Sequence, residues 1–127
     1  MNNQELAEKA KELRRLAIDA CFAAQSGHPG SALSTMDVLV SLYYGGHLKH
    51  DPKNPTDEKR DYFVLSNGHA CPGWYSVLAD RGYFPVAELQ NLRQLDAGVQ
   101  GHPHRGSLPG VEVSSGSLGQ GLSVGIG

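Results

Sequence analysis

The 127-residue chain has no apolar run of the roughly 20 residues that a helix needs to cross a bilayer. It also lacks an excess of positive charge, with 13 acidic and 11 basic side chains and a formal charge of -2. Nucleic-acid-binding surfaces normally carry clustered Lys and Arg, and the N-terminus has no apolar region typical of a secretory signal. The composition therefore argues against nucleic acid and membrane partners and predicts a cytoplasmic protein.

Cysteine is also scarce, since Cys21 and Cys71 are the only two and lie far apart in the sequence. Two such cysteines make neither a disulfide framework nor a metal knuckle. No serine or cysteine has a base partner at a recognisable spacing, so a hydrolase is not predicted.

Two histidine pairs, His47 with His50 and His102 with His104, have no carboxylate or thiolate companion at the spacing of a zinc site. We therefore expect no metal ligand set among residues 1–127.

Glycine, by contrast, is abundant near the C-terminus, and residues 97–117 show no periodicity. A stretch of this length without regular structure is uncommon in a compact domain unless it is functional or disordered. Elsewhere the spacing of apolar residues predicts helices. We expect helices over residues 3–25, from Ser34 to Gly45, from Pro72 to Gly82, over 86–95 and from Leu118 onward. The first begins with an Asn2–Glu5 capping box. The second is expected to bury Val38, Leu39, Leu42 and Tyr43, and the fourth to carry Leu89, Leu92 and Leu95 on one stripe.

One short apolar run, Tyr62-Phe63-Val64-Leu65, is bounded by turn residues and predicts a strand buried on both faces of a parallel sheet. Residues 66–69 would then lie at the carboxyl end of that strand, where open α/β sheets bind ligands. One strand cannot form a sheet alone. The pattern therefore predicts an α/β fold whose partner strands come from elsewhere, or the front part of a longer α/β domain.

Three histidines lie on turns rich in glycine or proline: His28 in Ser26-Gly27-His28-Pro29-Gly30, His69 after Ser66-Asn67-Gly68, and His102 in Gly101-His102-Pro103-His104. Each one by itself is consistent with an ordinary surface or capping residue. Together they suggest a site, because glycine lets the backbone approach a ligand closely and imidazole donates to phosphate or carbonyl oxygens. The histidine turns predict a site for an anionic small molecule.

A fourth turn, Gly116-Ser117-Leu118-Gly119-Gln120-Gly121, has no ionisable side chain. Its glycine order differs from that of a dinucleotide loop, and no Lys-Ser/Thr pair follows as in a phosphate-binding P-loop. We interpret it as backbone amides at the start of a helix, suited to contact an anion or a flat ring.

These segments, together with Arg93-Gln94-Leu95, occur in the order seen in the transketolase family and resemble its N-terminal, diphosphate-binding portion. Ser117 and the His69-Ala70-Cys71-Pro72 segment look like the split bacterial form, in which the two halves are separate polypeptides. The resemblance implies an N-terminal part of a three-layer αβα sandwich with a parallel sheet.

The resemblance implies transfer of a two-carbon ketol unit from a ketose phosphate to an aldose phosphate, with thiamine diphosphate as the electron sink. It implies that His28 and His102 face the reactive thiazolium carbon and the sugar hydroxyls. A pKa near the working pH suits histidine to such proton and hydroxyl contacts.

The cofactor contacts implied by the resemblance are His69 near the diphosphate and the backbone of Gly116, Ser117 and Leu118. Family members hold the diphosphate through Mg²⁺ or another divalent metal, whose ligands would lie beyond Gly127. The resemblance therefore implies that residues 1–127 are a partial diphosphate-binding domain, truncated before the metal-binding motif. This portion alone would be inactive.

The implied partners are sugar phosphates, a C-terminal transketolase subunit or the remainder of the chain, and further copies in a homo- or hetero-oligomer. Two alternatives stay open at this point. One is 1-deoxyxylulose-5-phosphate synthase, a related thiamine enzyme, against which His28-Pro29-Gly30 and His102-Pro103 argue. The other is a non-catalytic remnant or assembly subunit.

Overall fold

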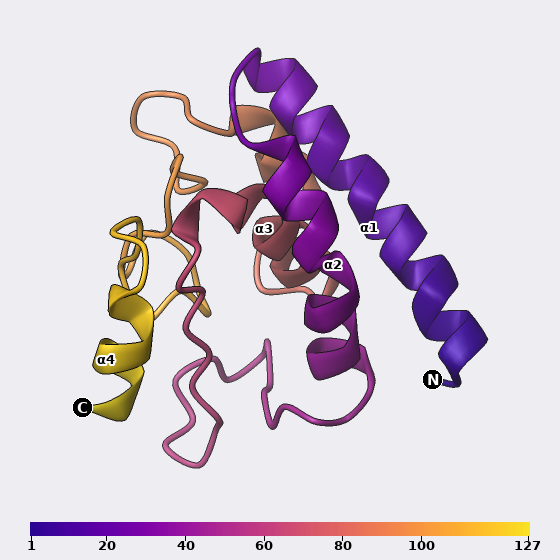
Figure 1. Cartoon of the computed structure of the whole chain (residues 1–127), viewed down its shortest axis with the longest axis vertical. Coiled ribbons are helices and arrows are strands. Elements are labelled where there is room, and N and C mark those ends of the chain that lie inside the picture. The colour runs from indigo at the N-terminus through magenta and orange to yellow at the C-terminus, as the bar shows by residue number, and fades with distance from the viewer.

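Three α-helices form the core of the structure, a computed structural model that describes all 127 residues. They are α1 (Asn3–Ala24), α2 (Pro29–Tyr44) and α3 (Cys71–Asp80), and Figure 1 shows them packed side by side. The side chains of α3 are buried from Cys71 to Ala79, so α3 is the central helix. The largest fully buried side chains include Trp74, Tyr75, Leu13, Met36 and Leu39.

Helix α1 follows its sequence pattern closely. The predicted capping box is confirmed, because the Glu5 amide donates to Asn2 Oδ1 at 2.9 Å and the Asn2 amide donates to Glu5 Oε2 at 2.7 Å. Its buried residues recur at helical spacing and face α2 and α3. The helix ends where Gln25 adopts a left-handed φ of 50°.

Helix α2 begins at Pro29, earlier than the predicted start at Ser34. Proline suits the first helical position, because its fixed φ is helical and the missing N–H needs no partner there. Val38 is exposed, against our expectation, because it lies off the buried face of α2. Leu39 and Tyr43 are buried as predicted, and Leu42 is partly buried. Helix α3 lies close to α2 because Gly73 has no side chain, and a Cβ there would lie 2.8 Å from the Ala32 carbonyl oxygen.

The predicted α/β fold class is wrong for this chain, which consists of helices and loops and contains no β-strand. Residues 62–65 have no partner strand, and a strand exists only through its hydrogen-bonded neighbour. Their apolar side chains serve other contacts. Phe63 packs against Tyr43 and Trp74 with ring centroids 5.7 and 5.2 Å apart, Leu65 is buried, and Tyr62 is exposed.

The segment predicted as a helix over 86–95 is a short 3-10 helix, η2 (Val86–Asn91). Leu89 and Leu92 are buried as expected, but Leu95 is 92% exposed. The stripe breaks because the helix ends at Asn91: Leu92 already has an extended ψ of 127°, and Arg93 follows with a left-handed φ of 63°. Residues 97–117 form no regular element, as predicted.

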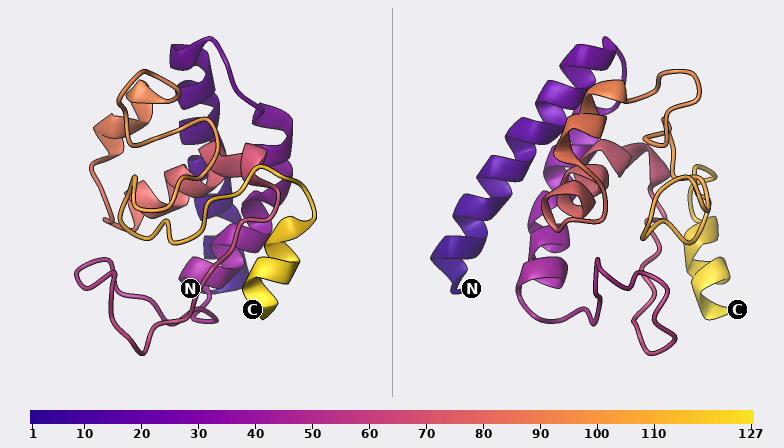
Figure 2. Two further views of the ribbon diagram at one scale, coloured as in Figure 1. Left: turned by 90° about the vertical axis from the view of Figure 1, so that its left-hand side faces the viewer. Right: turned by 180° about the vertical axis from the view of Figure 1, so that it is seen from behind.

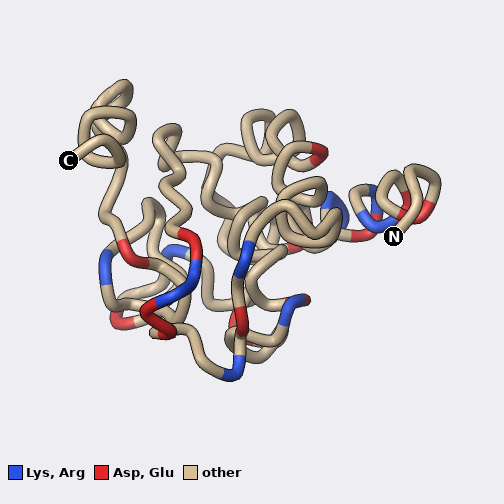
Figure 3. Tube along the Cα trace, turned by 90° about the horizontal axis from the view of Figure 1, so that it is seen from below, with Lys and Arg blue, Asp and Glu red and all other residues tan.

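The last helix, α4 (Gln120–Ile126), stands apart from the three-helix core and packs against none of the other helices. Figure 2 shows it on the opposite side of the molecule from α1. It carries no charged side chain, whereas charges gather on α1 and on the loop before residue 62 (Figure 3). No helix in the structure combines the length and apolar character that crossing a lipid bilayer requires.

Candidate functional site

His28 directly precedes α2 and is positioned by the turn that ends α1. Gly27 has a φ of 133°, and a Cβ there would lie 2.9 Å from Cys21 Sγ, so only glycine fits this turn. The His28 carbonyl accepts hydrogen bonds from the Ala32 amide at 3.3 Å and from Ser31 Oγ at 3.1 Å. The backbone of His28 is therefore held while its imidazole stays exposed.

His69 lies in a single 3-10 turn, η1 (Gly68–Ala70), immediately before α3. The Asn67 carbonyl accepts from the Ala70 amide at 2.8 Å, and Asn67 Nδ2 donates to Thr35 Oγ1 of α2 at 3.3 Å. The imidazole of His69 is half-buried. The turn therefore presents His69 from the end of the central helix.

His102 is carried by a loop that the first residue of α3 holds in place. Cys71 Sγ is a donor to the carbonyl oxygens of Gly101 at 3.2 Å and Gln100 at 3.5 Å. Burial raises the pKa of the Cys71 thiol to about 12, so the thiol keeps the proton that it donates. On the other side of His102, the Pro103 carbonyl accepts from the Ser115 amide at 3.1 Å.

The three imidazoles converge, although they come from widely separated positions in the sequence. The ring centroids of His28 and His69 are 5.5 Å apart with the ring planes at 87°, and those of His28 and His102 are 6.4 Å apart at 53°. We call these three residues the histidine cluster. The convergence matches the grouping proposed from the sequence.

The histidine cluster favours neutral imidazole at His102. Partial burial of its ring lowers the pKa of His102 from the ordinary value of 6.5, and the charges of Arg93, His28 and His69 lower it further. Because the shift is downward, the ring gains its proton at a lower pH than an ordinary histidine. A neutral ring can accept a proton or donate one hydrogen bond.

The glycine-rich turn reaches the cluster at Gly116. This residue has a φ of 149°, and a Cβ there would lie 3.3 Å from Cδ2 of His102. Gly68 packs against the same turn, since its Cβ would lie 2.8 Å from the Gly116 amide nitrogen. Ser117 and Leu118 follow Gly116 and are exposed.

The residues present fit part of thiamine diphosphate. Three imidazoles offer donors for phosphate oxygens, and the bare backbone at Gly116 leaves room beside His102 for a close approach. They do not fit its divalent metal, because no group of three His, Cys, Asp or Glu side chains is placed to hold an ion.

The other histidines lie outside the cluster. His50 contacts Tyr83 Oη at 3.0 Å and the Tyr43 carbonyl oxygen at 3.2 Å, and its burial lowers its pKa. His50 therefore has a structural role, while His47 and His104 are exposed.

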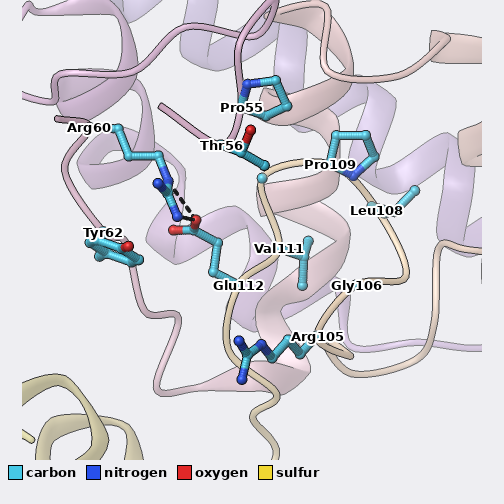
Figure 4. A pocket seen from close by; sticks show the side chains of 11 residues that line it. Pro55, Thr56, Arg60, Tyr62, Arg105, Gly106, Leu108, Pro109, Val111 and Glu112 are labelled. Atoms are coloured by element: carbon cyan, nitrogen blue, oxygen red, sulfur yellow. Dashed lines mark hydrogen bonds and ion pairs between the residues drawn. The ribbon is translucent and has the colours of Figure 1, made fainter. Parts of the chain in front are cut away.

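The largest cavity, of about 540 Å³, is separate from the cluster and no histidine lines it. Figure 4 shows Arg60 and Glu112 paired at its wall. Arg60 Nε also donates to Glu112 Oε1 at 2.6 Å, and its guanidinium lies 4.3 Å from the centre of the Tyr62 ring. Sequence reasoning missed this pair, because no local pattern links residues so far apart in the chain.

Comparisons with known proteins agree with the geometry. Residues 6–127 match the family described as transketolase, thiamine diphosphate binding domain. The transketolase of Buchnera aphidicola subsp. Acyrthosiphon pisum is 46% identical over 121 residues, which are 94% of this chain and 18% of that protein. Transketolase 2 of Escherichia coli K12 is 46% identical over 119 residues, covering 93% of this chain and 18% of that protein.

Solved structures give the same result. The transketolase of Campylobacter jejuni subsp. jejuni superposes with a TM-score of 0.87 at 45% identity, covering 97% of this chain and 19% of that one. The Leishmania mexicana transketolase gives a TM-score of 0.88 at 36% identity, covering 93% and 18%. The chain thus spans about a fifth of the length of these relatives. On the family match over residues 6–127, the chain belongs to the transketolase family and corresponds to the N-terminal part of its thiamine diphosphate binding domain.

Proposed function

We propose that this chain supplies the histidine-bearing part of a transketolase site, in which a two-carbon ketol unit passes from a ketose phosphate to an aldose phosphate. The observation that carries the proposal is the meeting of His28, His69 and His102 beside the bare backbone of Gly116. Thiamine diphosphate, when bound, supplies the electron sink for cleavage and formation of the carbon–carbon bond. Identities of 45–46% to several proteins named transketolase support this activity over that of 1-deoxyxylulose-5-phosphate synthase.

The three histidines of the cluster have different proposed roles, which follow from their positions. His69, at the end of the central helix, donates to the diphosphate, and the backbone of Gly116, Ser117 and Leu118 lies against the cofactor. His28 and His102 face the reacting carbon and the sugar hydroxyls, where a neutral imidazole accepts or returns a proton. The direction of the His102 pKa shift supports this role, since a neutral ring is the proton-accepting form.

We propose that the remaining parts of the site are supplied by residues outside this chain. No metal ligand set occurs in this chain, so Mg²⁺ or another divalent ion and the diphosphate together require residues outside it. We propose that residues 1–127 form a partial diphosphate-binding domain that works in an oligomer with a C-terminal subunit or with a longer polypeptide.

The isolated chain is expected to bind thiamine diphosphate weakly, because only part of the donor set is present. Isothermal titration calorimetry with thiamine diphosphate, with and without Mg²⁺, measures this affinity. A dissociation constant in the micromolar range, near -8 kcal/mol in binding free energy, would contradict the proposed incompleteness.

Ketol transfer tests the activity itself. The chain is mixed with, or fused to, the remaining four-fifths of a relative such as E. coli transketolase 2, and transfer between a ketose phosphate and an aldose phosphate is measured. The matched control is the relative's own N-terminal segment, supplied in the same way. Activity with this chain supports the proposal. Inactivity beside an active control would identify a non-catalytic remnant.

A further inference from the structure

Arg93 has an unusual backbone for an arginine. Its φ of 63° is left-handed, a region that costs a side-chain-bearing residue of order 1–3 kcal/mol and persists only where the surroundings enforce it. Buried neighbours hold this backbone conformation on both sides of Arg93. Leu92 before it is fully buried, and the Arg93 amide donates to the carbonyl of the buried Val99 at 3.0 Å. The backbone conformation therefore fixes the direction in which the Arg93 side chain projects.

That side chain lies across the turn that carries His102. A Cβ on Gly101 would lie 2.8 Å from Nη1, 3.0 Å from Cζ and 3.4 Å from Cγ of Arg93. The contact runs along much of the arginine side chain, and it exists only because residue 101 has no side chain. On the Cys71 side, the Gly101 carbonyl accepts from the buried thiol. The Gly101–His102 turn is thus held by Arg93 as well as by Cys71.

The charge of Arg93 has no carboxylate partner. The ion pairs of the structure involve Lys9, Lys11, Arg14 and Arg60, and none involves Arg93. Around His102, the charged or titratable groups that affect its protonation are Arg93, His28 and His69, and no acidic group is among them. An uncompensated guanidinium therefore acts on the His102 imidazole.

We propose that Arg93 is a positioning residue of the histidine cluster: its guanidinium lies across Gly101, holds the turn that presents His102, and keeps positive charge near the His102 ring. The meaning of this role rests on the proposed function, because a neutral His102 matters for proton transfer. The contact between Arg93 and Gly101 does not depend on that function.

Direct titration of His102 tests the proposal. The full chain is studied by NMR at low ionic strength and without cofactor or sugar, following the ring resonances of His102 from pH 5 to 8, the range in which histidine titrates. In the unchanged chain we expect a pKa below 6.5. Arg93→Met removes the charge, so the pKa of His102 is expected to rise toward 6.5, whereas Arg93→Lys should leave it low.

Gly101→Ala provides a second, independent variant. Its φ is not in the left-handed region, so alanine is tolerated by the backbone, but the new Cβ pushes the flexible end of Arg93 away. The pKa of His102 should again rise although the charge is still present. Because both changes act through one contact, their effects in the double variant should be less than additive.

Arg105→Met is the matched control, since Arg105 is an exposed arginine in the same loop that does not influence the His102 pKa. It should leave the titration of His102 unchanged. Equal titration curves for Arg93→Met and the unchanged chain, or equal shifts for Arg93→Met and Arg105→Met, would overturn the proposal. Additive effects of Arg93→Met and Gly101→Ala would overturn it as well. Failure of ketol transfer in the completed enzyme is a separate result, because no cofactor or substrate enters this titration.

Discussion

In an enzyme completed with the remainder of a relative, His102→Ala is expected to lower the turnover of ketol transfer by about 10²–10³-fold, the usual cost of removing one positioned hydrogen-bonding group from a reaction centre. The affinity for thiamine diphosphate should change little, because His102 is proposed to face the sugar rather than the diphosphate. Steady-state kinetics with saturating cofactor give the turnover. Cofactor titration by quenching of intrinsic fluorescence gives the affinity.

His69→Ala is the contrasting variant and should mainly weaken cofactor binding. The structure offers the control His104→Ala, an exposed histidine two positions from His102 and outside the cluster. That control should retain both turnover and cofactor affinity. Equal cofactor affinities in the His69 and His102 variants would contradict the division of roles. Unchanged turnover in His102→Ala would remove His102 from the reaction altogether.

Gly68→Ala is expected to destabilise the chain by about 1–3 kcal/mol, the range typical of overpacking a close contact. The new Cβ would lie 2.7 Å from Ser115 Oγ and 2.8 Å from both the Ser115 carbonyl carbon and the Gly116 amide nitrogen. Two of these atoms belong to the backbone and cannot swing away, so the glycine-rich turn has to move. Urea unfolding measures the loss of stability. The ring resonances of His102, which lies beside Gly116, report the displaced turn.

Gly30→Ala is the matched control for this prediction. Gly30 lies in the first turn of α2 with a φ outside the left-handed region, and nothing lies within 4 Å of the position that a Cβ would take. Alanine there should be neutral or slightly stabilising, because it reduces the freedom of the unfolded chain. If Gly68→Ala unfolds at the same urea concentration as the unchanged chain and leaves His102 unshifted, the packing of the turn on Gly68 is not tight.

The helices that could be predicted were those with local signals. The capping box of α1 and Pro72 in the first turn of α3 act within a few residues of each helix start, and the structure retains both. The predicted start of α2 at Ser34 is too late, because Pro29 already takes the first helical position, where its fixed φ suits a helix. In the candidate site, the motifs predicted that His28, His69 and His102 belong to one site, but not that their rings lie together.

Whether residues 62–65 form a strand could not be decided from the local sequence alone. An apolar run of four residues is equally suited to a sheet and to packing against helices, and the choice depends on whether a partner strand is available. In this structure Phe63 and Leu65 pack into the helical core instead. Arg93 was likewise visible as part of a motif, but its backbone conformation and its contact with Gly101 depend on distant residues.

The sequence by itself determined that α1 and α3 form and roughly where they begin, which turns glycine makes possible and which family the motifs resemble, because periodicity, caps and motif order are properties of neighbouring residues. Only the tertiary structure decided that three of the six histidines meet, that residues 62–65 remain unpaired, and that Arg93 and Cys71 hold the turn before His102. The physical reason is that such contacts join segments far apart in the chain. They form only when the burial of α3 between its neighbours has brought those segments together.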